Sequence, residues 1–102
     1  MVIMEGKKRN QFNSYVKSVA VAFDVSEDDI FSDSREKDVI DARHMIMYLC
    51  KARPMPMKFI HSMFDERGLV MDYTSVMYGC KSGEKKAKKD VDFSETVQQI
   101  MA

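Results

Sequence analysis

The sequence predicts an all-α domain of about six helices, and three observations support this fold class. Apolar residues recur at helical spacing in most segments of the chain. No segment alternates apolar and polar residues over the length of a strand. Prolines and glycines fall mainly between the periodic segments, where they separate one helix from the next. A chain of 102 residues is long enough for one domain with a single core.

The first predicted helix carries apolar residues at helical spacing from Phe12 to Phe23. Residues 1–9 end in a basic segment, "GKKR", and show no comparable spacing. We therefore expect residues 1–9 to form a flexible basic lead-in and residues 10–102 to form a single helical domain.

A short helix and a loop precede the clearest helix of the sequence. Ser26, with Asp29 three residues later, resembles a capping box, which predicts the start of a helix. The segment "SDSREKD" is expected to be a loop. The clearest helix is predicted over Lys37–Ala52, with acidic residues in its first turns that suit the positive end of a helix. Its apolar stripe consists of Val39, Ala42, Ile46, Leu49 and Cys50.

Three further helices follow the segment "RPMP", which ends the long helix because a residue before proline avoids the helical conformation. Pro56 suits the first position of a helix that runs to about Phe64. After a turn, the next helix is predicted over Asp72–Ala87, although Gly79 and Gly83 weaken it. A last short helix is predicted over Ser94–Met101.

The charges balance overall but are distributed unevenly. A free-standing nucleic-acid binder is usually basic, so sixteen basic against sixteen acidic residues count against that function. However, residues 24–41 carry eight acids against Arg35 and Lys37, whereas residues 81–89 carry five lysines against Glu84. The local field decides where a phosphate backbone can bind. The lysine-rich segment is expected to be either a solvated helix face or a non-specific phosphate contact.

The sequence offers no candidate catalytic or metal site. His44 and His61 have no carboxylate or cysteine at metal-ligand spacing, and Cys50 and Cys80 form no zinc-binding pattern. No nucleophilic triad, phosphate-binding glycine loop or EF-hand pattern is present. We therefore expect a protein that is not an enzyme and has neither a cofactor nor a metal.

Other features of composition bear on location and partners. No secretory segment or long apolar run is present, so a cytoplasmic protein with no membrane partner is expected. Cys50 and Cys80 lie in apolar helical patterns and are expected to be buried, reduced thiols. The ten methionines indicate either a loosely specified helical core or a methionine-rich binding surface.

The segment at about residues 56–81 has the pattern of a helix-turn-helix. In such a unit the N-terminal residues of the second helix reach base edges in the major groove of DNA. A helix start needs one capping residue, such as Asp72 or Thr74, but this helix opens with a run of polar residues. Two interpretations therefore stay open, a cap and a DNA contact. The polar residues at this position are Asp72, Tyr73, Thr74 and Ser75.

Three segments together resemble a known family. They are "SVAVAFDVSEDDIFSDSREKDVIDARHMIMYLCK" (residues 18–51), "FIHSMF" and "MDYTSVMYGCK". They are similar to the C-terminal DNA-binding domain of the bacterial replication initiator DnaA, over about residues 15–85. The residues that match in the first segment are Val19, Ala20, Phe23, Val25, Asp29, Ile30, Ser32, Arg35, Val39, Arg43, Met47, Tyr48 and Leu49.

The resemblance implies a helical fold related to the Trp repressor, and it implies binding to a short asymmetric duplex site, the DnaA box. By position, Arg35 matches the loop arginine that enters the minor groove, where a narrow A·T-rich groove attracts guanidinium groups. Arg43 and Lys51 match backbone-contacting positions, and Met57 and Lys58 match the start of the first motif helix. The matches to the base-reading trio are Asp72, Tyr73 and Thr74, and Ser75 matches a phosphate contact.

The sequence departs from the family pattern near these positions. Met71 stands where the family has an arginine, and Tyr73 where it has a histidine. The turn "DERGLVM" is longer than the family's glycine-rich turn, and acids dilute the charge of the loop before the long helix. The initiator's ATPase domain has no counterpart in this sequence, so we expect a stand-alone DNA-binding chain rather than an ATP-driven initiator.

The sequence thus predicts sequence-specific binding of double-stranded DNA, in replication or transcription control in a bacterium or a phage-infected cell. The alternative is a protein-interaction module that keeps the fold but binds DNA weakly or not at all. Its partner would be a replication or regulatory protein, or a second copy of the chain. The sequence leaves the oligomeric state open.

Overall fold

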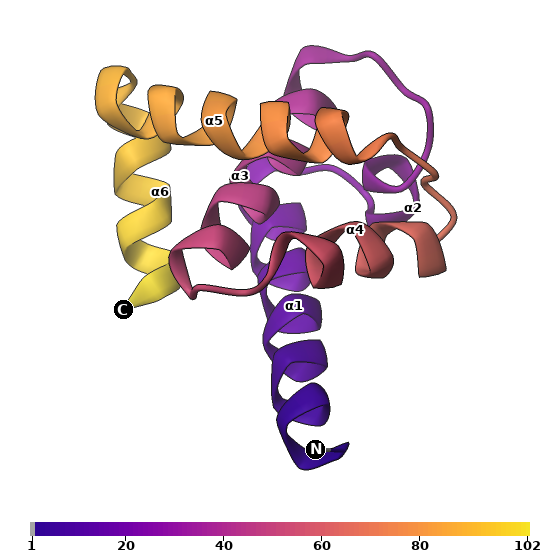
Figure 1. Ribbon diagram of the computed structural model, residues 1–102. Coiled ribbons are helices and arrows are strands. Elements are labelled where there is room, and N and C mark those ends of the chain that lie inside the picture. Colours follow the sequence, from indigo (N-terminus) through magenta and orange to yellow (C-terminus); the bar gives the residue numbers. More distant parts are fainter. Residues whose placement is uncertain (1) are drawn as a thin grey trace.

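The computed structural model describes the backbone of residues 2–102 and the side chains of residues 6–102. These residues form six α-helices and no strand (Figure 1), which confirms the predicted all-α fold class. None of the helices in this part of the chain combines the length and the apolar composition needed to span a bilayer. The helices are α1 (Val2–Phe23), α2 (Glu27–Ile30), α3 (Lys37–Ala52), α4 (Met57–Glu66), α5 (Tyr73–Lys89) and α6 (Val91–Met101).

Helix α3 is the centre of the fold, because it packs against each of the other five helices. Its bounds agree with the predicted Lys37–Ala52, and the whole predicted apolar stripe is buried. In Figure 1, α5 crosses in front of α3, and α6 descends from the C-terminal end of α5. The buried residues of α3 are Val39, Ala42, Met45, Ile46, Met47, Leu49 and Cys50.

The N-terminal region differs from the expectation. The sequence predicts a flexible lead-in over residues 1–9, whereas α1 already begins at Val2. An ion pair joins this part of α1 to α4, with Arg9 Nη1 at 2.7 Å from Glu66 Oε1. The partner lies far along the chain and the segment lacks apolar spacing, so the sequence carries no local signal for this helix.

Local capping explains where two of the helices begin. The Ser26 hydroxyl accepts a hydrogen bond from the backbone N–H of Asp29 at 3.0 Å, which confirms the predicted cap of α2. The Asp90 carboxylate accepts one from the backbone N–H of Phe93 at 3.1 Å. Because of this cap, α6 begins before the predicted Ser94.

Two glycines allow α5 to lie directly against α3. Gly79 and Gly83 are four residues apart and share one face of α5. A Cβ atom at Gly83 would lie 2.5 Å from the carbonyl oxygen of His44 and 2.6 Å from the Cβ of Tyr48. A Cβ atom at Gly79 would collide with the sulfur of Met47. These glycines, expected to weaken the helix, therefore determine how closely α5 packs.

A polar cluster also joins α3 to α5, closer to the C-terminal end of α5. Lys86 Nζ donates to Asp41 Oδ1 at 2.6 Å and to His44 Nδ1 at 2.8 Å, while Lys37 Nζ donates to Asp41 Oδ2 at 2.7 Å. Burial, helped by the charge of Lys86, lowers the pKa of His44 to about 4. Burial opposes ionisation of Asp41, but the hydrogen bonds from Lys37 and Lys86 outweigh it and lower the pKa of that carboxyl. His44 is therefore a neutral acceptor near pH 7.

The close crossing makes Gly83 intolerant of a side chain. Gly83→Ala should lower the free energy of unfolding by about 1–3 kcal/mol, because the added methyl meets the backbone of α3 rather than a flexible side chain. Denaturant unfolding measures this change. Gly6→Ala is the matched control, since no atom lies within 4 Å of its Cβ position and alanine favours a helix by about 1 kcal/mol. Equal stability of the two variants would contradict the crossing.

Candidate nucleic-acid interface

The predicted helix-turn-helix is formed by α4, a turn, and α5. The two helices lie side by side, with α5 above α4 in Figure 1. Pro56 immediately precedes α4, and Asp72 occupies the N-cap position of α5.

The long turn between these helices is fixed to the N-terminal part of the fold through Arg67. Its guanidinium group donates to Glu27 Oε1 at 3.0 Å and to Asn13 Oδ1 at 3.3 Å. The same group lies 4.3 Å from the centroid of the Phe31 ring, which adds a cation–π contact. The extra residues of the turn are thus attached to α1 and α2, and α5 still follows α4 in a defined position.

Backbone conformation and further contacts fix the turn between Arg67 and the start of α5. Gly68 has a φ of +98°, a left-handed conformation that other residues rarely adopt. His61 Nε2 donates to the carbonyl oxygen of Met71 at 2.6 Å, just before α5 begins. The Tyr73 ring lies beside His61, with ring centroids 6.1 Å apart. These contacts fix the approach of the chain to the N-terminus of α5.

The side chains at the start of α5 are not used to cap the helix. Asp72 stands at the N-cap with extended backbone, yet its carboxylate makes no capping hydrogen bond. The side chains of Thr74 and Ser75 are exposed and make no hydrogen bond within the described part of the chain. Of the two interpretations left open by the sequence, capping by these side chains is therefore excluded.

The start of α5 and the loop before α3 line one groove. Arg35 from the loop lies in its wall together with Thr74 and Ser75 from α5, and Tyr78 one turn further on completes that side. Arg35 is exposed and separated from Thr74 by the whole of α3 and α4 in sequence. The fold thus brings the predicted minor-groove arginine, one predicted base-reading residue (Thr74) and one predicted phosphate contact (Ser75) to the same surface.

Arg43 also lines this groove, but most of its donors are used inside the chain. Its guanidinium group donates to the carbonyl oxygens of Ile30 at 2.7 Å, Ser34 at 2.9 Å and Ser32 at 2.6 Å, and more weakly to that of Asp29 at 3.3 Å. An arginine has five N–H donors, so one is left for another partner. Burial, and then the nearby charge of Arg35, lowers the pKa of Arg43. The first role of Arg43 is therefore to hold the loop that carries Arg35.

The other predicted contact residues are divided between surfaces. Lys51 and Met57 line a second groove on the opposite side of α5, where the Met57 sulfur lies 4.0 Å from that of Cys80. The residues that line neither groove are Lys58, Asp72 and Tyr73, although all three are exposed. Tyr78 was not among the predicted residues. Its spacing of four residues from Thr74 is the signal that places it on the same helix face.

Residues 13–82 match the family model described as "Bacterial dnaA protein helix-turn-helix". This chain belongs to that family. The match covers α2 to α4, the second half of α1 and most of α5, including all the residues predicted to contact DNA. The predicted membership in the DnaA family is thereby confirmed.

Individual relatives agree with this membership. The chain is 28% identical to the chromosomal replication initiator protein DnaA of Lachnoclostridium phytofermentans, over 99% of this chain and 22% of the relative. It is 35% identical to that of Aquifex aeolicus, over 80% of this chain and 20% of the relative. A crystal structure of a DNA replication initiation factor superimposes with a TM-score of 0.76 at 31% identity, covering 95% of this chain and 29% of that one. The chain spans about a fifth of the length of these DnaA relatives.

The position of Arg43 leads to a test that separates support of the loop from a direct phosphate contact. Arg43→Lys keeps the positive charge but loses the forked donors. We expect it to lower stability by about 1–3 kcal/mol and to speed amide exchange in residues 29–35, because several carbonyl groups lose a charged donor. Hydrogen exchange followed by mass spectrometry measures the loop directly. Unchanged exchange in this segment would contradict the positioning role.

Proposed function

We propose that this chain binds double-stranded DNA sequence-specifically through the groove between the Arg35 loop and the N-terminus of α5. Its membership in the DnaA helix-turn-helix family supports this function, and occupation of DNA sites would act in replication or transcription control. The observation that carries the proposal is the shared groove, where polar side chains without intramolecular partners meet an exposed arginine.

The chemistry of the groove suits a duplex. The major groove of B-DNA is about 12 Å wide and admits a helix, whose N-terminal residues then face base edges. Hydroxyls such as those of Thr74 and Ser75 pair with several bases. Asp72 lies outside the groove but is exposed at the N-cap of α5, and its carboxylate would accept from the amino group of cytosine. Arg35, which stands on the neighbouring loop, would enter an adjacent minor groove.

The sequence preference is proposed to differ from that of a DnaA box. Met71, in the place of the family arginine, packs partly buried against the core and offers no charged donor. Tyr73, in the place of the family histidine, carries a phenol next to the ring of His61. With one fewer cation beside the bases and Asp33 in the groove wall, fewer counterions are released on binding. Binding is therefore proposed to be weaker at equal salt concentration.

A protein-interaction module is the second candidate. Asp28 and Asp29 of α2 are exposed, and the exposed Asp33 of the following loop lines the groove. Their carboxylates oppose a phosphate backbone and suit a basic protein surface. In this case the chain would keep the family fold while its partner is a replication protein or a second copy of itself.

Binding of a fluorescent duplex tests the proposal. We compare a duplex that carries a DnaA box, its scrambled version, and a selected high-affinity sequence, with the variants Arg35→Ala and Thr74→Ala. Loss of one base contact at Thr74 should weaken binding to the preferred sequence by about 1–3 kcal/mol, or roughly 5- to 150-fold. Arg35→Ala should also reduce the dependence of affinity on salt by about one counterion.

Lys17→Ala and Ser14→Ala on α1 are matched controls, because both side chains are exposed and lie outside the groove. They should leave affinity and sequence preference unchanged. Full affinity of both groove variants would refute the assignment of the site. Absence of binding to any duplex at low salt would refute DNA binding and favour the protein-interaction module.

A further inference from the structure

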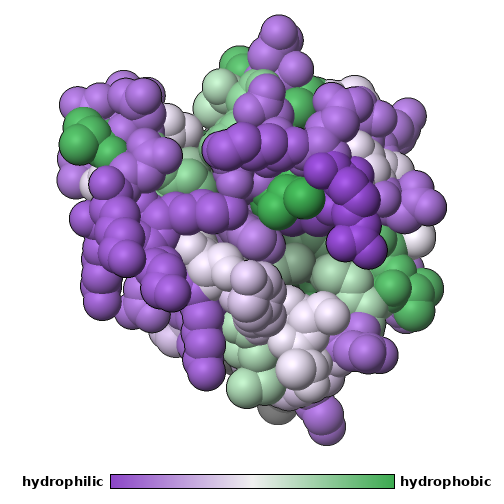
Figure 2. Space-filling model, turned by 90° about the horizontal axis from the view of Figure 1, so that it is seen from above, coloured by the Kyte–Doolittle hydropathy of each residue, from purple (hydrophilic) through white to green (hydrophobic). Residues whose placement is uncertain are grey.

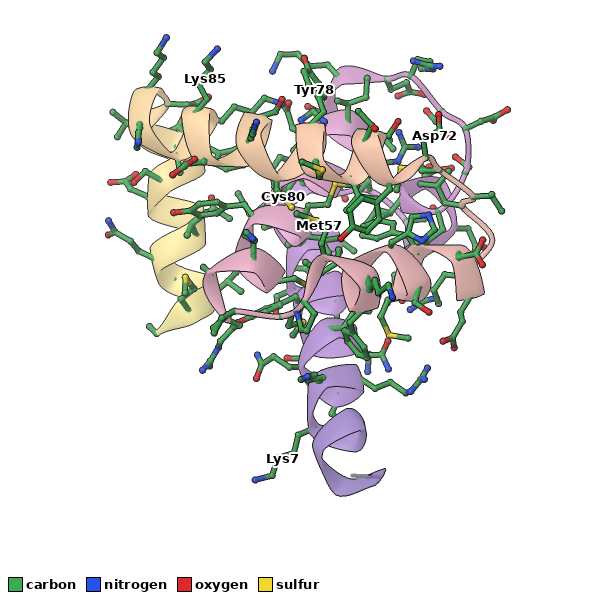
Figure 3. All side chains as sticks on the ribbon, viewed as in Figure 1. Lys7, Met57, Asp72, Tyr78, Cys80 and Lys85 are labelled. Atoms are coloured by element: carbon green, nitrogen blue, oxygen red, sulfur yellow. The ribbon has the colours of Figure 1, made fainter. Side chains whose placement is uncertain are left out.

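The outer face of α5 carries a row of side chains that continues well beyond the groove. Thr74, Tyr78, Lys81, Lys85 and Lys89 follow one another at intervals of three or four residues, which places them on one face of the helix. Figure 3 shows Tyr78 and Lys85 on the side of α5 that points away from α4, whereas Cys80 lies on the inner side. The lysines therefore share the face of α5 that begins with the groove residues.

Tyr78 connects two hollows on this face. It lines the groove that contains Arg35 and Thr74, and it also lines the neighbouring hollow, whose wall includes Lys81, Lys85 and Lys89. Viewed from above, hydrophilic residues gather on the left, where the C-terminal half of α5 lies (Figure 2). The two hollows thus form one continuous surface that is polar at one end and strongly basic at the other.

The five lysines of residues 81–89 differ in whether they have a partner within the chain. Lys86 is held by Asp41 and His44, and Lys88 lies 3.9 Å from Glu84. Lys81, Lys85 and Lys89 are exposed and make no ion pair within residues 6–102. The three lysines on the outer face are therefore the ones whose ammonium groups are available to an anionic partner.

The length of α5 places the two distal lysines, Lys85 and Lys89, outside the bases that its N-terminus would reach. At 1.5 Å per residue, Lys89 stands about 22 Å from Thr74 along the helix axis, nearly twice the width of a major groove. This distance corresponds to about six to seven base pairs along a duplex. A helix whose first turn lies in the groove would therefore carry its lysine row along or across the sugar–phosphate backbone.

We propose that Lys81, Lys85 and Lys89 form a second, sequence-independent contact with the phosphate backbone of duplex DNA that flanks the recognised site on one side. This inference rests on the proposed DNA binding and adds to it a longer and directional footprint. The lysine row supplies a local positive field on a chain whose charges cancel overall, and it lies at the opposite end of the surface from Asp33.

The test uses the full chain and the double variant Lys85→Gln/Lys89→Gln. We measure its affinity over a range of salt concentrations for duplexes extended by about eight base pairs on one side, or on the other side, of the preferred site. For the wild type, one extension should strengthen binding and the other should not. The double variant should lose this benefit, and the slope of log affinity against log salt should fall by about two.

Lys7→Gln/Lys17→Gln is the matched control, because it removes the same charge from exposed positions on α1. Lys7 lies at the far end of the molecule from Lys85 (Figure 3). The control should keep both the slope and the directional benefit. An equal loss in both double variants would show an effect of net charge alone and overturn the inference. Wild-type binding that is independent of both extensions would also overturn it, whereas the proposed function would stand because the sequence preference remains.

Discussion

The packing of α5 against α3 is the constraint on which the rest of the structure depends. Helix backbones approach this closely only where side chains are absent, and Gly79 and Gly83 provide that absence on one face of α5. With the inner face fixed in this way, the opposite face of the helix points outward along its whole length. The N-terminal polar residues and the distal lysines are exposed for the same geometric reason.

Two arginines then position the segments at either side of the α5 N-terminus. Arg43 gathers the carbonyl groups of the loop before α3, and Arg67 attaches the long turn to Glu27 and Asn13. Both guanidinium groups act within the chain, which leaves Arg35 as the arginine exposed in the groove. The contacts of Arg67 hold the long turn in place. The helix-turn-helix therefore keeps a defined shape although its turn is longer than that of the family.

Local and periodic features of this fold were predictable from the sequence. The stripe of α3 repeats at helical spacing, and the Ser26 cap depends on residues three apart, so both are encoded locally. The family resemblance assigns a DNA contact to both Arg35 and Thr74, although two helices separate them in the sequence. Their position on one surface was therefore predictable from the resemblance. The role of Arg43 inside the loop was not predictable, because an arginine at a backbone-contacting position has the same local sequence whichever partner it binds.

The features that escaped prediction depend on contacts between distant segments. The first turns of α1 lack apolar spacing and are joined to α4 through Arg9 and Glu66. Considered alone, the two glycines of α5 predict a helix of lower stability. Their role in close packing becomes apparent only when α5 is seen against α3. Tyr78 belongs to none of the motifs in the sequence. Its importance becomes apparent only in the structure, where it lines both hollows.

The central claim is that the Arg35 loop and the N-terminus of α5 form one DNA-binding surface. The most direct measurement is an NMR titration of the labelled chain with its preferred duplex, following every backbone amide. The account predicts that the largest shifts fall together in residues 32–35 and 72–78, with small changes in α6 and the first turns of α1. Shifts confined to α1 and α6, or shifts in only one of the two predicted segments, would contradict it.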